Sequence, residues 1–179
     1  CWTPVTTFSE SGGDWQADLI ERDGSAFTVL HHQVPVGEVR WSLLGKHNVE
    51  NALAAIAAAH HAQVAPALAV QALSTFKNVK RRLEVKGKVN EIVVYDDFAH
   101  HPTAIATTLA GLRARIGKKA RMVAVVEFGS YTMRSGVHKD HIQAAFSDAD
   151  MVICKNTETD WGLKATLAQF TQPTALYDD

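Results

Sequence analysis

The chain has 179 residues, of which 46% are hydrophobic and 21% are charged, and its formal net charge is −1. These values are typical of a globular protein that buries a substantial core. A near-neutral charge gives no general attraction to nucleic acid or to a membrane surface, and we expect neither as a partner. The two cysteines, Cys1 and Cys154, provide neither a disulfide framework nor a thiolate metal site, so we expect a reducing, cytoplasmic compartment.

The first 44 residues have the pattern of a small β-sheet. Residues 15–21 and 26–31 are predicted strands, and the Arg-Asp-Gly-Ser sequence between them indicates a hairpin. Residues 39–44 are predicted to form a third strand. Three strands bury too little surface to be stable alone, so we expect this segment to be the tail of a sheet whose other strands lie upstream.

From Gly45 onward, helices and strands alternate. Predicted helices are residues 48–62, 66–76, 102–116, 138–149 and 161–170, and predicted strands are residues 83–86, 91–95, 121–127, 151–154 and 174–177. This alternation predicts an α/β, Rossmann-like fold with a mainly parallel sheet and helices on both faces. We therefore divide the chain into residues 1–44 and a second domain, residues 45–179.

The densest group of polar residues is Asp-Asp-Phe-Ala-His-His-Pro-Thr at residues 96–103. It places two carboxylates at the end of a strand and two imidazoles at the start of a helix. Ligands of parallel sheets bind at the carboxyl ends of strands, and a helix N-terminus favours anions. A simple helix cap or a zinc site is also conceivable, but neighbouring histidines in an extended loop rarely bind one ion. Since a cap does not require four titratable groups, we favour a functional site.

Two further segments carry candidate binding residues. His47, Asn48 and Asn51 lie at the start of a predicted helix, and an asparagine amide offers the donor and acceptor that an adenine edge needs. An ordinary cap followed by a surface asparagine explains this segment equally well. Arg81 and Arg82 lie in a basic run, and the planar guanidinium group suits phosphate or ribose. We interpret the lysines of that run as solvated, and the absence of interleaved aromatic residues argues against nucleic-acid binding.

In this order and spacing, the three segments resemble the Mur ligase family. The last domain of that family begins with Gly-x-His-Asn-x-x-Asn, as at residues 45–51, and continues with Arg-Arg before an acidic residue, as at residues 81–84. Members that act on UDP-N-acetylmuramate also carry Asp-Asp-Phe/Tyr-x-His-His-Pro-Thr, as at residues 96–103. The resemblance extends from about Trp15 to the end of the chain.

The resemblance implies an ATP-dependent amide ligase. In that reaction, the carboxylate of UDP-N-acetylmuramate is phosphorylated with ATP and Mg²⁺. The amine of a murein tripeptide, L-Ala-γ-D-Glu-meso-diaminopimelate, then attacks the acyl phosphate, in the recycling of peptidoglycan. The resemblance implies nucleotide-binding roles for five residues: His47, Asn48, Asn51, Arg82 and Asp97.

The resemblance also places His100 and His101 at the reaction centre and residues 127–134 beside the incoming peptide. We expect Arg134, assisted by Ser130, to hold an anionic group of the peptide, because this loop and Asp97 are predicted to follow strands of one sheet. A solvated Arg134 is an equally good interpretation. We expect no metal ligand in this chain, because the family holds Mg²⁺ mainly in its central domain.

The chain departs from the family pattern in three places. It has no Gly-x-x-x-x-Gly-Lys-Ser/Thr phosphate loop, it has Phe128-Gly129 where Pro-Arg is common, and it stops before the usual Ser-Asn-Gly-Gly-Phe ending. We therefore expect N-terminal and central domains of the same polypeptide as partners, and an inactive fragment without them.

Three alternatives remain open. The first is a ligase that joins L-alanine to UDP-N-acetylmuramate, and the second is a non-catalytic adenine-nucleotide binding module. The third is a metal hydrolase using Asp97 and His101, for which the sequence offers no third ligand. The strands before residue 44 favour a ligase, because an independent module would seldom begin with an incomplete sheet.

Overall fold

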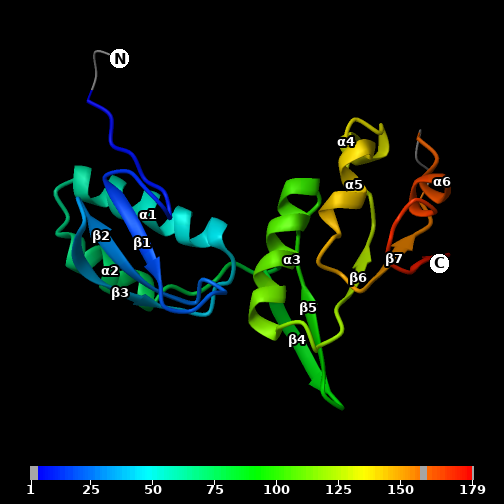
Figure 1. Cartoon of the computed structure of the whole chain (residues 1–179), viewed down its shortest axis with the longest axis horizontal. Coiled ribbons are helices and arrows are strands. Elements are labelled where there is room, and N and C mark those ends of the chain that lie inside the picture. The colour runs from blue at the N-terminus through cyan, green and yellow to red at the C-terminus, as the bar shows by residue number, and fades with distance from the viewer. Residues whose placement is uncertain (1–3, 158–160, 179) are drawn as a thin grey trace. The chain divides into compact units, whose positions relative to one another are not determined.

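The computed structural model describes residues 4–157 and 161–178. They form two compact units, Cys1–Glu84 and Val85–Asp179 (Figure 1). We had expected the second domain to start at Gly45, whereas the compact units divide after Glu84. The physical reason is that both helices of the segment 45–84 pack against the first sheet. Where the domains of the family meet in this sequence stays a prediction.

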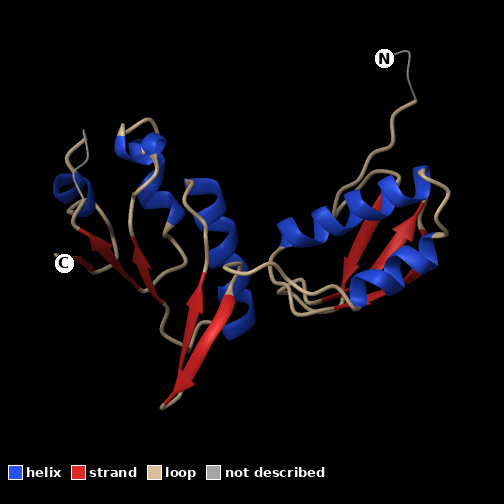
Figure 2. Ribbon diagram, turned by 180° about the vertical axis from the view of Figure 1, so that it is seen from behind, coloured by secondary structure: helices blue, strands red, loops and turns tan. Residues whose placement is uncertain are grey.

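The first unit consists of an antiparallel sheet and two helices. The sheet order is β1 (Trp15–Leu19), β2 (Ala26–His31) and β3 (Val34–Arg40). Helices α1 (Lys46–His61) and α2 (Pro66–Ser74) lie over this sheet (Figure 2). The third strand thus begins earlier than the predicted range 39–44. The turn before it is formed by His32 and Gln33, which both adopt left-handed backbone conformations with φ of 48° and 68°.

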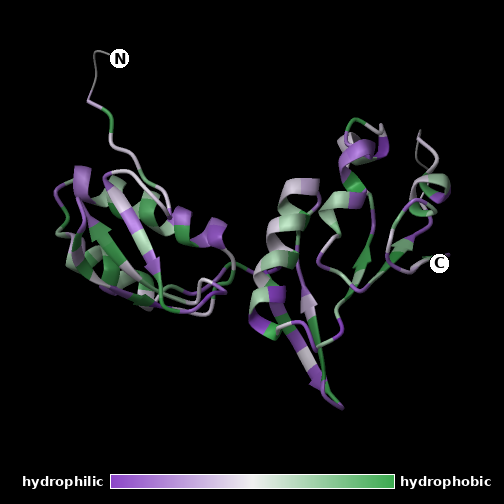
Figure 3. Ribbon diagram, in the orientation of Figure 1, coloured by the Kyte–Doolittle hydropathy of each residue, from purple (hydrophilic) through white to green (hydrophobic). Residues whose placement is uncertain are grey.

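The core of the first unit lies between the sheet and the helices, where Figure 3 shows hydrophobic residues on both layers. Fully buried side chains come from the three strands and from one face of α1: Trp15, Phe27, Val29, Val39, Val49, Leu53 and Ile56. Gly37 of β3 allows α2 to approach closely, because a Cβ at this position would lie 3.1 Å from Cγ1 of Val70.

The second unit contains a hairpin and a parallel sheet. The hairpin joins β4 (Glu84–Val89) to β5 (Ile92–Asp96) through Asn90 and Glu91, so β4 ends three residues later than the predicted strand 83–86. The parallel sheet has the order β6 (Val123–Val126), β7 (Met151–Lys155) and β8 (Thr174–Tyr177). Its helices are α3 (Pro102–Ile116), α4 (Tyr131–Arg134), α5 (Lys139–Ala145) and α6 (Leu163–Leu167). The predicted α/β class with a parallel sheet is confirmed.

β5 lies in a different sheet from β6, whereas we had expected the two strands to share one. Among the described residues, β5 pairs with β4, and the parallel sheet consists of β6, β7 and β8. The loops after β5 and β6 therefore do not follow strands of one sheet, as we had assumed. The short turn at residues 90–91 makes β4 the local partner of β5.

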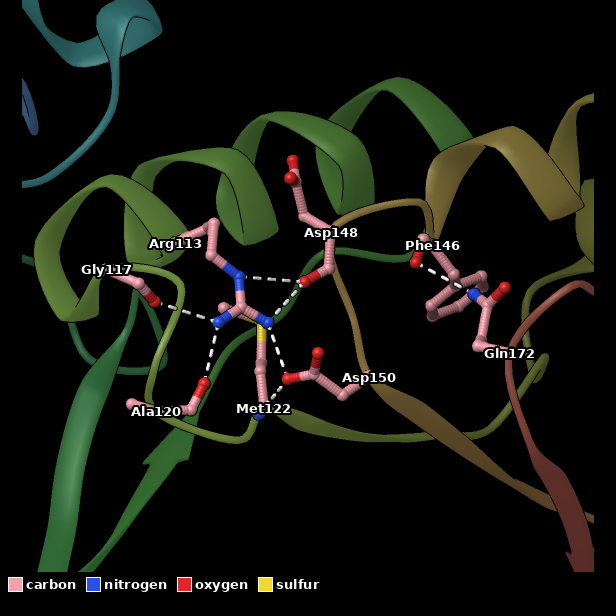
Figure 4. A network of polar contacts seen from close by, with 8 residues as sticks. All are labelled: Arg113, Gly117, Ala120, Met122, Phe146, Asp148, Asp150 and Gln172. Atoms are coloured by element: carbon pink, nitrogen blue, oxygen red, sulfur yellow. Dashed lines mark hydrogen bonds and ion pairs between the residues drawn. The ribbon is translucent and has the colours of Figure 1, made fainter.

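A network around Arg113 joins the end of α3 to the start of β6 and β7 (Figure 4). The guanidinium group donates at 2.7–3.1 Å to the backbone carbonyls of Gly117, Ala120 and Asp148. It also lies 2.6 Å from the Asp150 carboxylate, which accepts the Met122 N–H. These two donors, the Met122 N–H first, hold the pKa of Asp150 below its usual value.

The buried hydrophobic side chains of the second unit include several from β7, α4 and α5 and from the loops beside them. The fully buried members are Phe128, Met133, Ile142, Phe146, Val152 and Cys154. Among the described residues, no helix has the length and apolar character required to span a bilayer.

Candidate functional site

The segment between β5 and α3 has a well-defined backbone. Asp97 Oδ1 accepts the Ala99 N–H at 2.7 Å, which closes a tight turn directly after the strand. His101 is the N-cap of α3: its backbone is extended, and its Nδ1 accepts the Thr103 N–H at 3.3 Å. Pro102 is the first helical residue, where a missing N–H has no cost. The capping interpretation of this segment is therefore correct for His101, and it leaves the remaining ring nitrogen available.

The two exposed histidines of this segment are hydrogen-bonded in opposite senses. His100 Nδ1 lies 2.9 Å from the Phe98 carbonyl oxygen, which can only accept, so Nδ1 donates. In the neutral ring, this leaves Nε2 of His100 as an acceptor. His101 accepts through Nδ1, so its ring proton lies on Nε2, which is a donor. The loop thus presents one imidazole acceptor and one imidazole donor at consecutive residues.

The loop after β6 forms a short helix that the sequence did not reveal. Ser130 is the N-cap of α4, and its Oγ accepts the Met133 N–H at 3.4 Å. Met133 is buried, whereas Arg134, at the last position of α4, is exposed. Ser130 therefore has a local structural role, and the peptide-binding role of both residues stays a prediction.

A contact between two histidine rings brings the two loops together. The ring centroids of His101 and His138 are 4.3 Å apart at an interplanar angle of 71°. Figure 1 likewise shows the start of α3 and helices α4 and α5 at one end of the second unit. The reason that we gave for their proximity, a shared sheet, was wrong, but the segments adjoin. Our sequence reasoning did not single out His138, and only its position at the start of a predicted helix could have indicated it.

The adenine-side candidates lie at the start of α1 in the first unit. Asn48 Nδ2 donates to the Leu44 carbonyl at 2.7 Å, so part of its amide is used to fix the start of the helix. His47 is half-buried, and Asn51 is exposed one turn further along. The helix-capping interpretation thus accounts for the Asn48 Nδ2–H donor. The adenine-binding role of these three residues stays a prediction.

Arg82 lies in a constrained loop between α2 and β4. Its neighbours Arg81 and Leu83 adopt left-handed conformations, with φ of 59° and 45°. Asn78 Nδ2 donates to the Arg82 carbonyl at 2.7 Å, and Glu84 accepts the Arg81 N–H at 2.9 Å. Strained backbone at non-glycine residues is retained only where the surroundings enforce it, and these two contacts do so.

Two further observations bear on the charged groups of the second unit. Lys86, which we interpreted as solvated, lies 3.7 Å from the Asp96 carboxylate and is half exposed. In residues 4–157 and 161–178, no three His, Cys, Asp or Glu side chains are close enough to hold a metal ion. The hydrolase interpretation therefore gains no third ligand.

Two family profiles match the chain. The Mur ligase middle domain matches residues 2–59, and the Mur ligase, glutamate ligase domain matches residues 81–175, more than half of the chain. The second range includes Arg82, Asp97, both histidines of the α3 segment and Arg134.

Curated relatives of the same family align with most of the chain. The UDP-N-acetylmuramate–L-alanyl-γ-D-glutamyl-meso-2,6-diaminoheptanedioate ligase of Haemophilus influenzae is 49% identical over 174 residues, which is 97% of this chain and 38% of that protein. The enzyme of the same name from Escherichia coli is 50% identical over 152 residues, 85% of this chain and 33% of that protein. The chain thus spans between a third and two fifths of these relatives.

Solved structures agree in fold. A murein peptide ligase from Psychrobacter arcticus has a TM-score of 0.67 and 41% identity, covering 99% of this chain and 39% of that one. The UDP-N-acetylmuramate–alanine ligase of Thermotoga maritima has a TM-score of 0.75 at 22% identity, covering 97% and 39%, and supports the fold alone. With its motifs, its profiles and these relatives in agreement, the chain belongs to the Mur ligase family.

Proposed function

We propose that this chain is part of an ATP-dependent ligase that joins L-Ala-γ-D-Glu-meso-diaminopimelate to UDP-N-acetylmuramate in peptidoglycan recycling. The observation that carries this proposal is the identity of 49% to 50%, over most of the chain, to two ligases named for these substrates. We place the reaction in the cytoplasm, where ATP is available.

ATP and Mg²⁺ would supply the phosphoryl group that activates the muramate carboxylate. The chain contains no phosphate loop, so the phosphates and the metal would be held mainly by the rest of the polypeptide. The groups that the chain provides fit the other end of the nucleotide. Asn51 and Asn48 offer amides for adenine, Asp97 offers a carboxylate for ribose hydroxyls, and Arg82 offers a guanidinium for ribose or phosphate.

The histidine pair fits the amide-forming step. The attacking amine must lose a proton, and the Nε2 acceptor of His100 is suited to take it. Negative charge develops on the oxygen of the attacked carbonyl, and the Nε2–H donor of His101 is suited to stabilise it. The positive end of the α3 dipole adds to that stabilisation. Ser130 and Arg134 would bind a carboxylate of the peptide from the neighbouring loop.

The experiment is an assay of the full-length ligase with UDP-N-acetylmuramate, ATP and Mg²⁺, offering either the tripeptide or L-alanine as the amine. We expect ADP release and a coupled product, identified by mass, with the tripeptide. Product with L-alanine alone would assign the alanine-ligase activity, whose curated representatives include one from Desulforapulum autotrophicum that is 40% identical over 82% of this chain. ATP binding without any product would indicate a non-catalytic adenine-nucleotide binding module. The 179-residue chain alone should be inactive, since it lacks the phosphate loop.

A further inference from the structure

His138 contacts the site from outside the family motifs. It is the residue before α5, it is half-buried, and its ring meets that of His101 in a T-shaped arrangement with centroids 4.3 Å apart. Aromatic rings in this arrangement attract one another beyond the effect of area burial. No role proposed above uses His138, so its position calls for its own explanation.

The loop that carries His138 is held in place by contacts with Trp161. Gly136 has a φ of +78° and packs on Trp161 so closely that a Cβ would lie 2.7 Å from the tryptophan Cβ. Trp161 Nε1 donates to the Met133 carbonyl at 2.7 Å, and the Met133 side chain is buried. The loop is thus held at Met133 and at Gly136, two residues before His138, and His138 can serve as a support.

His101, by contrast, is held weakly by its own hydrogen bond. The Thr103 N–H lies 3.3 Å from Nδ1, at the long end of the range for such bonds. The ring is exposed, so without lateral contact it would be free to rotate about its Cβ–Cγ bond and exchange its tautomer. Rotation would remove Nε2–H from the position in which it serves as a donor.

We propose that His138 is a positioning residue: its ring holds the His101 imidazole with Nδ1 on the α3 cap and Nε2–H free to donate to the reacting groups. The identity of those groups rests on the proposed ligase function, whereas the orientation of the ring does not. A functional side chain held by a packed neighbour loses less entropy when the substrate binds, and errors of about 1 Å in such positions lower rates by up to about 100-fold.

The first test is the tautomeric state of His101 in the 179-residue chain, measured by ¹⁵N NMR of the imidazole nitrogens. We expect Nε2 to carry the proton in the wild type, both tautomers to be populated in His138→Ala, and the wild-type state to return in His138→Phe, which restores a flat ring. His141→Ala is the matched control, because His141 is exposed one turn further along α5. An unchanged His101 tautomer in His138→Ala overturns the proposal.

The second test uses the kinetics of the full-length ligase. His138→Ala should lower kcat roughly 10- to 100-fold with the KM for ATP unchanged, and His138→Phe should recover most of that loss. Equal losses in the Ala and Phe variants would refute positioning by ring packing. A wild-type protein without ligase activity would refute the proposed function instead, and the NMR result would then decide the positioning role by itself.

Discussion

His101 caps α3, and we propose that it also acts as a donor from the same backbone position. Ser, Thr, Asp and Asn are the preferred N-cap residues, and any of them could accept the Thr103 N–H as His101 does. A histidine differs in that its second ring nitrogen remains available as a donor while the first caps the helix. The proposed donor role would therefore explain a histidine at this position, whereas helix stability alone would not. This is why the motif can look like a simple cap in sequence and still mark a site.

The nucleotide-side residues can be tested individually. Asn51→Ala and Asp97→Ala should each weaken ATP binding by about 1–3 kcal/mol, because each removes a hydrogen-bonding group proposed to contact adenine or ribose. Isothermal titration of the full-length ligase measures this change. Glu50→Ala, at the exposed neighbour of Asn51, is the control for α1. Asp97→Asn keeps the acceptor for the Ala99 N–H, so it separates loss of the turn from loss of the carboxylate. Unchanged Kd values in both Ala variants would refute these assignments.

Arg134 is the test of peptide recognition. Arg134→Ala should raise the KM for the tripeptide by roughly 10-fold or more, since one charge-assisted contact to a carboxylate is worth about 1.5–3 kcal/mol. The KM for ATP should change little. Steady-state kinetics on the full-length ligase give both values, and Lys139→Ala, at another exposed cation of the same segment, is the control. If the tripeptide KM does not move, Arg134 is a solvated surface charge; if both KM values rise, the loop is disturbed.

At the scale of elements, the sequence predictions were accurate where proline or glycine marks the end of a helix or strand. The limits of α3 were predicted correctly because Pro102 opens the helix and Gly117, with a φ of 72°, ends it. The strand β3 was misplaced because it contains Pro35 and Gly37, which are uncommon within strands, and because its turn uses His32 and Gln33.

For the candidate site as well, the sequence indicated local features and did not indicate contacts between distant residues. Residues 96–103 are contiguous, so their composition was sufficient to mark them. The contact of His101 with His138 and the support from Trp161 join residues distant in sequence, and no local pattern encodes them. Periodicity likewise does not show that β5 pairs with β4 without also joining the parallel sheet, as it does among the described residues.

The Arg113 network should be a major contributor to the stability of the second unit. Arg113→Lys removes the planar fork that reaches several carbonyls at once, and we expect a loss of about 1–3 kcal/mol in the free energy of unfolding. Urea unfolding measures this value. Lys118→Ala, at an exposed position just beyond α3, should change stability by less than about 0.5 kcal/mol. Equal effects of the two substitutions would show that the network contributes little.

The first unit should lose stability in mild acid. Burial first, and then the charges of His32 and His60, lower the pKa of His31 below its usual 6.5, while Asp14 acts in the opposite direction. Below about pH 6.5 the unfolded chain therefore binds a proton that the folded unit resists, and stability falls as the pH decreases through that value. The His31 ring stacks on Trp15 at 4.0 Å, so His31→Phe keeps the packing and removes the titration. Urea unfolding at about pH 7.5 and about pH 5.5 should show a smaller pH dependence in this variant. An equal dependence in both proteins would assign the effect to other groups.

At the scale of the whole molecule, the chain consists of two units with separate cores. The first is an antiparallel sheet covered by two helices, and the second combines a hairpin with a parallel sheet. The candidate residues are divided between them: His47, Asn48, Asn51 and Arg82 lie in the first, and Asp97, His100, His101, Ser130 and Arg134 lie in the second. A substitution in one unit should therefore leave the folding of the other unchanged, so losses of binding can be separated from losses of stability.

Because of its position, Cys154 can report how often the second unit opens. This residue lies in the central strand β7, its side chain is fully buried, and burial raises the pKa of the thiol to about 12. Alkylating reagents attack the thiolate, so the folded unit should be inert to iodoacetamide near neutral pH. In a Cys1→Ser variant, where Cys154 is the remaining thiol, each modified molecule marks one excursion in which β7 became exposed.

The rate at which Cys154 is alkylated should depend on the Arg113 network. Arg113→Lys should accelerate alkylation by the same factor by which it raises the unfolding equilibrium, roughly 5- to 150-fold for about 1–3 kcal/mol. Mass spectrometry of timed samples measures the rate. Fast labelling of the wild type would mean that β7 opens without unfolding of the unit. If labelling is slow and its rate follows the stability of the unit, alkylation of this native thiol measures the opening of the parallel sheet without an attached dye.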